Sequence, residues 1–253
     1  RRSSDLTEQP LIVILGPTAS GKTALAVELA CALDGEIISA DSRQIYRRLD
    51  IGTGKDLKEY GFIPYHLIDS HDIGDAFSVA HFQKAAFDAI NDVFARGKQP
   101  ILCGGTGLYI ESLLANYQFS HIPHFLSEPL DIQFPFVVFG LNPDTNSRRD
   151  KISARFHARL QEGMLEEVQQ LLFEGVHPEE LRWMGLEYKW TLNYLMGDIT
   201  QERFGQGLEV AIHQFAKRQM TYFRKMERGG ISITWIPDSL DFQGKSDFVL
   251  KNL

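Results

Sequence analysis

The segment Gly16-Pro17-Thr18-Ala19-Ser20-Gly21-Lys22-Thr23 has the residue types and the spacing of a phosphate-binding loop. It follows the apolar run Leu11 to Leu15 and leads into a helical stretch, which is the context that such a loop requires. The glycines allow successive N–H groups to point inward, and the helix N-terminus adds partial positive charge. Lys22 can supply a full charge to the outer phosphates, and the Thr23 hydroxyl is a candidate ligand for Mg²⁺.

Two further polar segments follow expected strands. Glu36 to Ser39 reads as a strand that ends at Asp41, and Pro100 to Cys103 leads into the glycine-rich turn that carries Thr106. The ligand crevice of an open parallel sheet lies at the carboxyl ends of its strands. Asp41 and Thr106 are therefore expected near the phosphates.

The elements that position these residues predict an α/β fold, namely a P-loop NTPase-like three-layer fold with a central parallel sheet. About five parallel strands are expected, with Leu11–Leu15 in the centre and Phe136–Leu141 as the last of them, and the alternating segment Ile231 to Ile236 is expected to form a closing strand. Residues 11–141 would form the P-loop α/β core, and residues 142–253 a helical C-terminal part packed on it. Helices are expected around 79–94, 152–162, 165–174, 188–195 and 200–227.

Composition excludes several classes of protein. The 253 residues carry a net charge of −7, and the longest apolar stretches are strand-sized, so no membrane span is expected. The eight histidines form no ligand-spaced cluster, which argues against a zinc site. The two cysteines suit packed thiols in a reducing, cytoplasmic compartment.

One expected helix carries a basic segment, although the chain as a whole is acidic. Between Lys217 and Arg228, five basic residues accompany one acidic residue, with Tyr222 and Phe223 between them. A solvated basic face is the simplest explanation. The contrast in charge and the interleaved aromatics favour contact with a nucleic-acid backbone.

Taken together, the motifs resemble the tRNA dimethylallyltransferases, also called tRNA isopentenyltransferases. The resemblance implies transfer of a dimethylallyl group from dimethylallyl diphosphate to the exocyclic amine of the adenosine 3′ of the anticodon in tRNA, with release of diphosphate. It also implies that the phosphate loop holds the diphosphate with Mg²⁺. Besides the loop, the matching stretches are Asp41 to Tyr46, Asp50 to Lys55, His66 to Asp69, Gly104 to Tyr109, Lys151 to Phe156 and Ala216 to Arg224.

The same resemblance assigns roles to single residues. Asp41 is the implied general base, Thr106 lies along the substrate channel and Arg155 helps to bind diphosphate. One departure is the segment Gly185-Leu186-Glu187-Tyr188, because the family usually has Gly-Tyr followed by a basic or polar residue there. The implied contacts to the anticodon arm of tRNA are Asp41, Ser42, Arg43, Gln44, Arg182, Lys217, Arg218, Gln219, Thr221 and Arg224.

Other functions stay open on the sequence. A small-molecule P-loop kinase would bind ATP, and the run ending in Asp69 could then imitate its Mg²⁺-holding strand. A close relative of the main interpretation is an adenylate prenyltransferase that acts on free nucleotides. A non-catalytic RNA-binding protein is disfavoured because Lys22, Thr23 and Asp41 are all present.

Members of the family normally carry a helical insertion after the helix that follows Thr106, whereas here 117–135 covers the whole distance. We expect that the sequence joins pieces across a missing segment. A neighbouring pair between Ala115 and Phe136 would then have a Cα separation far above the roughly 3.8 Å of consecutive residues. The protein is expected to act as a monomer.

Replacing Lys217, Arg218 and Arg224 together is expected to weaken tRNA binding and to flatten its salt dependence, because phosphate contacts are lost. Binding measured over a series of salt concentrations checks this. A salt slope equal to that of the unmodified protein would identify a merely solvated helix face.

Overall fold

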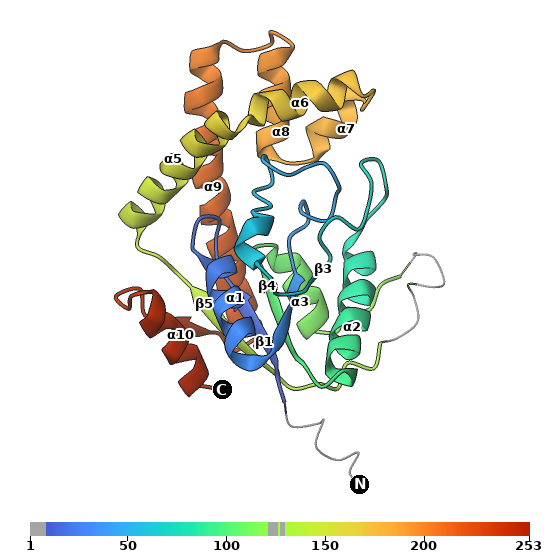
Figure 1. The fold of residues 1–253 in the computed structure, drawn as a ribbon, viewed down its shortest axis with the longest axis vertical. Helices are drawn as coiled ribbons and strands as arrows, with labels where there is room; N and C mark the ends of the chain where they lie inside the picture. The colour runs from blue at the N-terminus through green and yellow to red at the C-terminus, as the bar shows by residue number, and fades with distance from the viewer. Residues whose placement is uncertain (1–8, 121–125, 127–129) are drawn as a thin grey trace.

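The computed structural model describes residues 9–120, 126 and 130–253. A six-stranded sheet in the order β3-β2-β4-β1-β5-β6 forms its centre, and every pairing in it is parallel (Figure 1). The predicted α/β fold with a central parallel sheet is confirmed, with β1 in the interior. The strands are β1 (Leu11–Leu15), β2 (Gly35–Ser39), β3 (Tyr65–His66), β4 (Gln99–Gly104), β5 (Phe136–Leu141) and β6 (Thr234–Ile236).

One strand prediction is wrong. Phe136–Leu141 is not the last strand of the sheet, because Thr234–Ile236 returns from the C-terminal region and pairs parallel with it. The short alternating segment around Trp235 gave no sign of its direction, since direction depends on the route of the preceding helices. The predicted division at residues 141 and 142 stays a prediction, although β6 and the helix after it pack on the sheet.

The sheet is covered on both faces, and the alternation of side chains along β1 decides which residues face which layer. Leu11, Val13 and Leu15 pack with α2, α3 and α9, whereas Ile12 and Ile14 pack with α1 and α10. All five residues of β1 are fully buried. The bounds of these helices are α1 (Lys22–Leu33), α2 (Val79–Ala95), α3 (Gly107–Leu114), α9 (Gln201–Arg228) and α10 (Phe242–Lys251).

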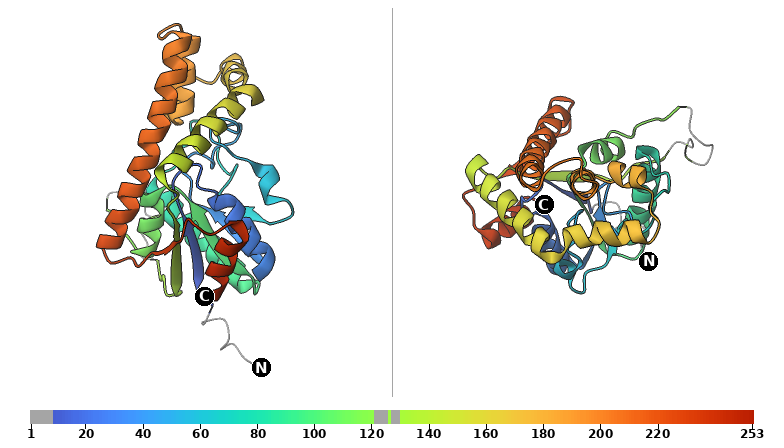
Figure 2. Two further views of the ribbon diagram at one scale, coloured as in Figure 1. Left: turned by 90° about the vertical axis from the view of Figure 1, so that its left-hand side faces the viewer. Right: turned by 90° about the horizontal axis from the view of Figure 1, so that it is seen from above.

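The remaining helices lie beyond the carboxyl ends of the strands (Figure 1). Helix α9 extends from this layer down along the sheet and so connects the two parts (Figure 2). The sequence predicted α5, α6, α8 and α9, but it missed α7, α10 and the short 3-10 turn Leu57–Tyr60. The bounds are α5 (Thr145–Glu162), α6 (Met164–Phe173), α7 (Pro178–Trp183) and α8 (Leu186–Leu195).

Within the described ranges, no helix combines the length and the apolar character needed to cross a membrane. The chain discontinuity predicted between Ala115 and Phe136 stays a prediction, because this span includes residues 121–125 and 127–129, which lie outside the described residues.

At the amino end of β2, a buried carboxylate joins this strand to the end of α2. The Glu36 side chain is 3% exposed, and it accepts hydrogen bonds from both terminal nitrogens of Arg96. It also binds Nε2 of His66 at 2.8 Å. These hydrogen bonds, of which that from Arg96 is the largest contribution, lower the pKa of Glu36 to about 2.

We expect Glu36→Gln to lower the free energy of unfolding at neutral pH by about 2 kcal/mol, after allowance for screening at the partly exposed Arg96. The folded-state pKa lies below the ordinary value of 4.5, so the contribution of Glu36 is present above that value. It is lost as the pH falls toward 2. Urea unfolding of both proteins across this range checks it, and a difference that stays constant with pH would contradict the assignment.

Candidate active site at the strand ends

The phosphate-loop motif forms the turn that its glycines predict. Gly21 has a φ of 81° at the N-cap of α1, so the helix begins at Lys22. Gly16 and Pro17 are buried and shape the turn. Lys22 Nζ donates to the carbonyl of Pro17 at 3.4 Å. Burial is the largest effect on Lys22 and lowers the pKa of its amine, as do Arg155 and Arg159 to a smaller extent.

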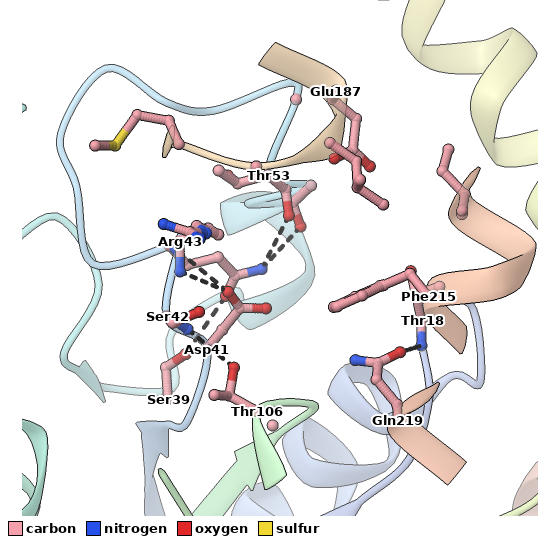
Figure 3. A pocket seen from close by; sticks show the side chains of 18 of the residues that line it. Thr18, Ser39, Asp41, Ser42, Arg43, Thr53, Thr106, Glu187, Phe215 and Gln219 are labelled. Carbon is pink, nitrogen blue, oxygen red and sulfur yellow. Dashed lines mark hydrogen bonds between the residues drawn. The ribbon is translucent and has the colours of Figure 1, made fainter. Parts of the chain in front are cut away.

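A cavity of about 360 Å³ opens beside this loop, between the strand ends and the helical layer (Figure 3). Seven Lys and Arg residues line it, against only two carboxylates, although the chain as a whole carries a net charge of −7. A cavity with this balance of charge attracts anions. The charged lining residues are Lys22, Arg43, Arg155, Arg159, Arg182, Lys189 and Arg218, with Asp41 and Glu187.

A second cavity of about 360 Å³ is also lined by residues of the phosphate loop. It shares Lys22, Thr23 and Arg155 with the first cavity. Ala19, Ser20 and Gly21 line only this one of the two. Ser20 Oγ is buried and has no hydrogen-bond partner within the described part of the chain. Residues of the phosphate loop therefore line two cavities.

Asp41 and Thr106 come together as the strand-end argument predicts, and both line the first cavity. One carboxylate oxygen of Asp41 accepts hydrogen bonds from the N–H groups of Arg43 and Gln44, at 2.9 and 3.3 Å. Thr106 Oγ1 accepts from the N–H of Ser42 at 3.1 Å. Because one Asp41 oxygen is fixed in this way, the other stays available toward the cavity (Figure 3).

Gln219 bridges the two glycine-rich turns. Its Oε1 accepts from the N–H of Thr18 at 2.9 Å, and its Nε2 donates to the carbonyl of Gly105 at 3.0 Å. The residue is 8% exposed. The observed contacts of Gln219 position the phosphate loop against the Thr106 turn, and its contact with RNA stays a prediction.

Two arginines of α5 reach the loop 50–56 under the cavity. Arg155 Nη2 donates to the carbonyl of Gly54 at 3.2 Å and pairs with Asp56 at 3.1 Å. Arg159, one helical turn later, donates to the carbonyl of Gly52 at 3.3 Å. A Cβ on Gly54 would overlap both guanidinium groups, and its φ of 62° also favours glycine. The glycine thus permits both cations to approach this backbone.

One carboxylate of the helical layer also binds the loop 50–56. Glu167 of α6 accepts from the N–H groups of Asp50, Ile51 and Gly52 at 3.0, 2.7 and 3.2 Å. It also accepts from the hydroxyl of Tyr188. Glu167 therefore fixes the backbone whose carbonyls position the two arginines.

The residues predicted to bind tRNA divide into two groups. Ser42, Arg43, Gln44, Arg182, Arg218 and Gln219 line the cavity together with Asp41. Lys217, Thr221 and Arg224 are exposed on α9 and do not line it. Successive helical residues point about 100° apart, so neighbours such as Lys217 and Arg218 cannot share one face.

Sequence reasoning missed several lining residues. Arg159 had a usable signal, since it lies one turn after Arg155 on the same helix. Trp183 and Phe215 at the cavity had none, because an aromatic side chain in a helix is usually part of the core. Trp183 is 74% exposed. Burial raises the pKa of the lining thiol Cys103 to about 12, which makes it unreactive.

The donor atoms fit Mg²⁺ better than a metal held by the protein alone. Among the described residues, no group of three or more His, Cys, Asp or Glu side chains could hold a metal. The Thr23 hydroxyl offers one hard oxygen ligand in the cavity. Mg²⁺ commonly binds through one or two protein oxygens, water and substrate phosphates.

The fold and the site define an α/β protein with a P-loop and an anion-binding cavity. A family model described as IPP transferase matches residues 44–130 and 119–226, and one described as Isopentenyl transferase matches residues 9–61. A Bacteroides fragilis protein named tRNA dimethylallyltransferase 2 is 40% identical over 303 residues, covering 98% of this chain and 99% of the relative. The chain belongs to the tRNA dimethylallyltransferase family.

Further comparisons agree. A Parabacteroides distasonis protein named tRNA dimethylallyltransferase 1 is 43% identical over 290 residues, covering 93% of this chain and 94% of the relative. The crystal structure of a Staphylococcus epidermidis tRNA delta(2)-isopentenylpyrophosphate transferase is 28% identical, with a TM-score of 0.84. It covers 97% of this chain and 98% of that one. The two IPP transferase matches overlap at 119–130, inside the segment where the sequence predicts a missing insertion.

We expect Glu167→Gln to lower the free energy of unfolding by about 2 kcal/mol. The amide NH₂ of glutamine would face backbone N–H groups whose hydrogen bonds the carboxylate now accepts. Glu166→Gln, on the exposed side of the same helix, serves as the matched control. Urea unfolding measures both. Equal stability of the two variants would show that Glu167 does not hold the loop.

Proposed function

We propose that this protein transfers a dimethylallyl group from dimethylallyl diphosphate to the exocyclic amine of an adenosine in tRNA, beside the anticodon. The main observation behind this proposal is the cationic cavity that Asp41 and Thr106 line together with the phosphate loop. The relatives' names support tRNA as the acceptor. The C1–O bond of the allylic donor breaks, the amine nitrogen bonds to C1, diphosphate leaves, and the amine loses a proton.

The protein's own residues suit these events. Lys22, the loop N–H groups and Arg155 would stabilise the charge that develops on the departing diphosphate. Asp41 would accept the proton from the amine, since one of its oxygens stays available toward the cavity. Thr106 would help to align the acceptor. Mg²⁺, held through Thr23 and the phosphates, would supply further neutralisation of the leaving group.

The target adenosine must leave its stack to enter the cavity, so contacts elsewhere on the tRNA have to offset the cost of flipping. Arg182, Lys189 and Arg218 line the cavity and can bind backbone phosphates. A reducing, cytoplasmic setting agrees with two free cysteines.

The kinase alternative loses its main support. Asp69, the candidate Mg²⁺-holding acid, pairs with the fully buried ammonium of Lys55 and does not line either cavity beside the phosphate loop. Lys55 also binds Asp50 at 2.9 Å and the carbonyl of Tyr46 at 2.8 Å. If Asp69 bound a metal ion instead, the buried ammonium of Lys55 would lose one of its carboxylate partners.

The deciding experiment offers the protein labelled dimethylallyl diphosphate and Mg²⁺ with either unmodified tRNA or AMP. We expect label in the tRNA. Label in AMP alone would establish an adenylate prenyltransferase, and label in neither would overturn the proposal. A parallel incubation with ATP and small acceptors tests for kinase activity, which we expect to be absent.

We expect Asp41→Asn to lower turnover by about a hundredfold while tRNA affinity changes little, because an amide cannot accept the proton. Single-turnover transfer and tRNA binding, measured on the same preparation, check it. Turnover equal to that of the unmodified protein would remove Asp41 from the role of general base.

A further inference from the structure

Arg159 and Glu187 form a charged pair deep in the cavity, and none of the steps above uses it. Their side chains are 9% and 20% exposed. Arg159 belongs to α5, and Glu187 lies in the first turn of α8 and points into the space that Asp41 faces from the other side (Figure 3). Two charges are thus withdrawn from water where substrates would bind.

The positive member of this pair is poorly compensated. A guanidinium has five N–H donors, yet within the described part of the chain Arg159 makes one hydrogen bond, to the carbonyl of Gly52. Its distance to the Glu187 carboxylate is 3.7 Å, which is too long for a hydrogen bond. Burial, and then the neighbouring Arg155, lower the pKa of Arg159. A buried cation in this condition is stabilised by an additional anion.

The position of Arg159 indicates which anion. The cavity of about 360 Å³ that is lined by Thr18 and Lys22 of the phosphate loop is also lined by Arg155, Arg159 and Glu187. Arg155 and Arg159 are also among the charges that act on Lys22. The loop and both guanidinium groups therefore surround one region, and such a cluster suits a ligand with two linked phosphates.

Glu187 faces the same region with the opposite charge. Burial raises the pKa of its carboxyl, while Arg159 and Arg155 oppose this effect. When ionised, Glu187 compensates Arg159 in the empty site. An incoming diphosphate would be repelled by Glu187 and attracted by Arg159.

We propose that Arg159 is a second guanidinium ligand of the diphosphate, and that Glu187 is a positioning residue that holds Arg159 when the site is empty and competes with diphosphate for it. This inference rests on the proposed function, because it assumes that diphosphate binds at the loop. The simpler explanation is that the pair only connects α5 to α8. The two explanations predict different effects on the affinity for pyrophosphate when Glu187 is removed.

The test is calorimetric titration of the full chain with pyrophosphate and Mg²⁺ near pH 8, where Glu187 is more fully ionised. We expect Arg159→Gln to weaken binding about tenfold and Arg159→Lys to restore part of it. Glu187→Gln is expected to tighten binding about fivefold, because the competing charge is removed. Arg149→Gln and Glu162→Gln, both exposed on α5, make the same charge changes away from the cavity and should have little effect.

Thermal unfolding of each variant accompanies the titrations. Pyrophosphate affinity that is unchanged in Arg159→Gln, or weaker in Glu187→Gln, would overturn the proposal. If Arg159→Gln does not fold, the direction in which Glu187→Gln changes the affinity for pyrophosphate decides the question. Failure of the unmodified protein to bind pyrophosphate and to prenylate tRNA would instead refute the proposed function, so the two failures are distinguishable.

Discussion

The site depends on one short loop, residues 50–56, which the helical layer holds from two sides. Glu167 accepts three of its backbone N–H groups, while Arg155 and Arg159 donate to its carbonyls at Gly54 and Gly52. These contacts join α5 and α6 to the α/β core next to the phosphate loop. Without them, the two arginines would have no fixed position relative to Lys22.

This arrangement explains how an acidic chain can bind a strongly anionic ligand. Positive charge is concentrated in one cavity, where the burial of Arg159 and the partial burial of Lys22 strengthen their interactions with an anion. The cost is visible in the lowered pKa values of Lys22 and Arg159, since both cations lose part of their contact with water. Diphosphate would offset this cost, and its departure as a leaving group would use the same charges.

Much of this could be predicted from the sequence, because the phosphate loop, Asp41 and Thr106 follow strands whose carboxyl ends must meet at one edge. The direction of β6 and the existence of α7 could not, since both depend on the path of distant helices. Within the site, Glu187 shows what could not be predicted from the sequence. Its sequence position indicates a departure from the family, but only the packing of α8 shows that it faces Arg159.

The most direct test of the account is a crystal structure with Mg²⁺ and pyrophosphate bound. The account predicts pyrophosphate against the N–H groups of Gly16 to Thr23, within contact of Lys22 and Arg155, with Asp41 facing the space left for the acceptor amine. Pyrophosphate bound elsewhere, or bound at the loop without either of these cations, would contradict it.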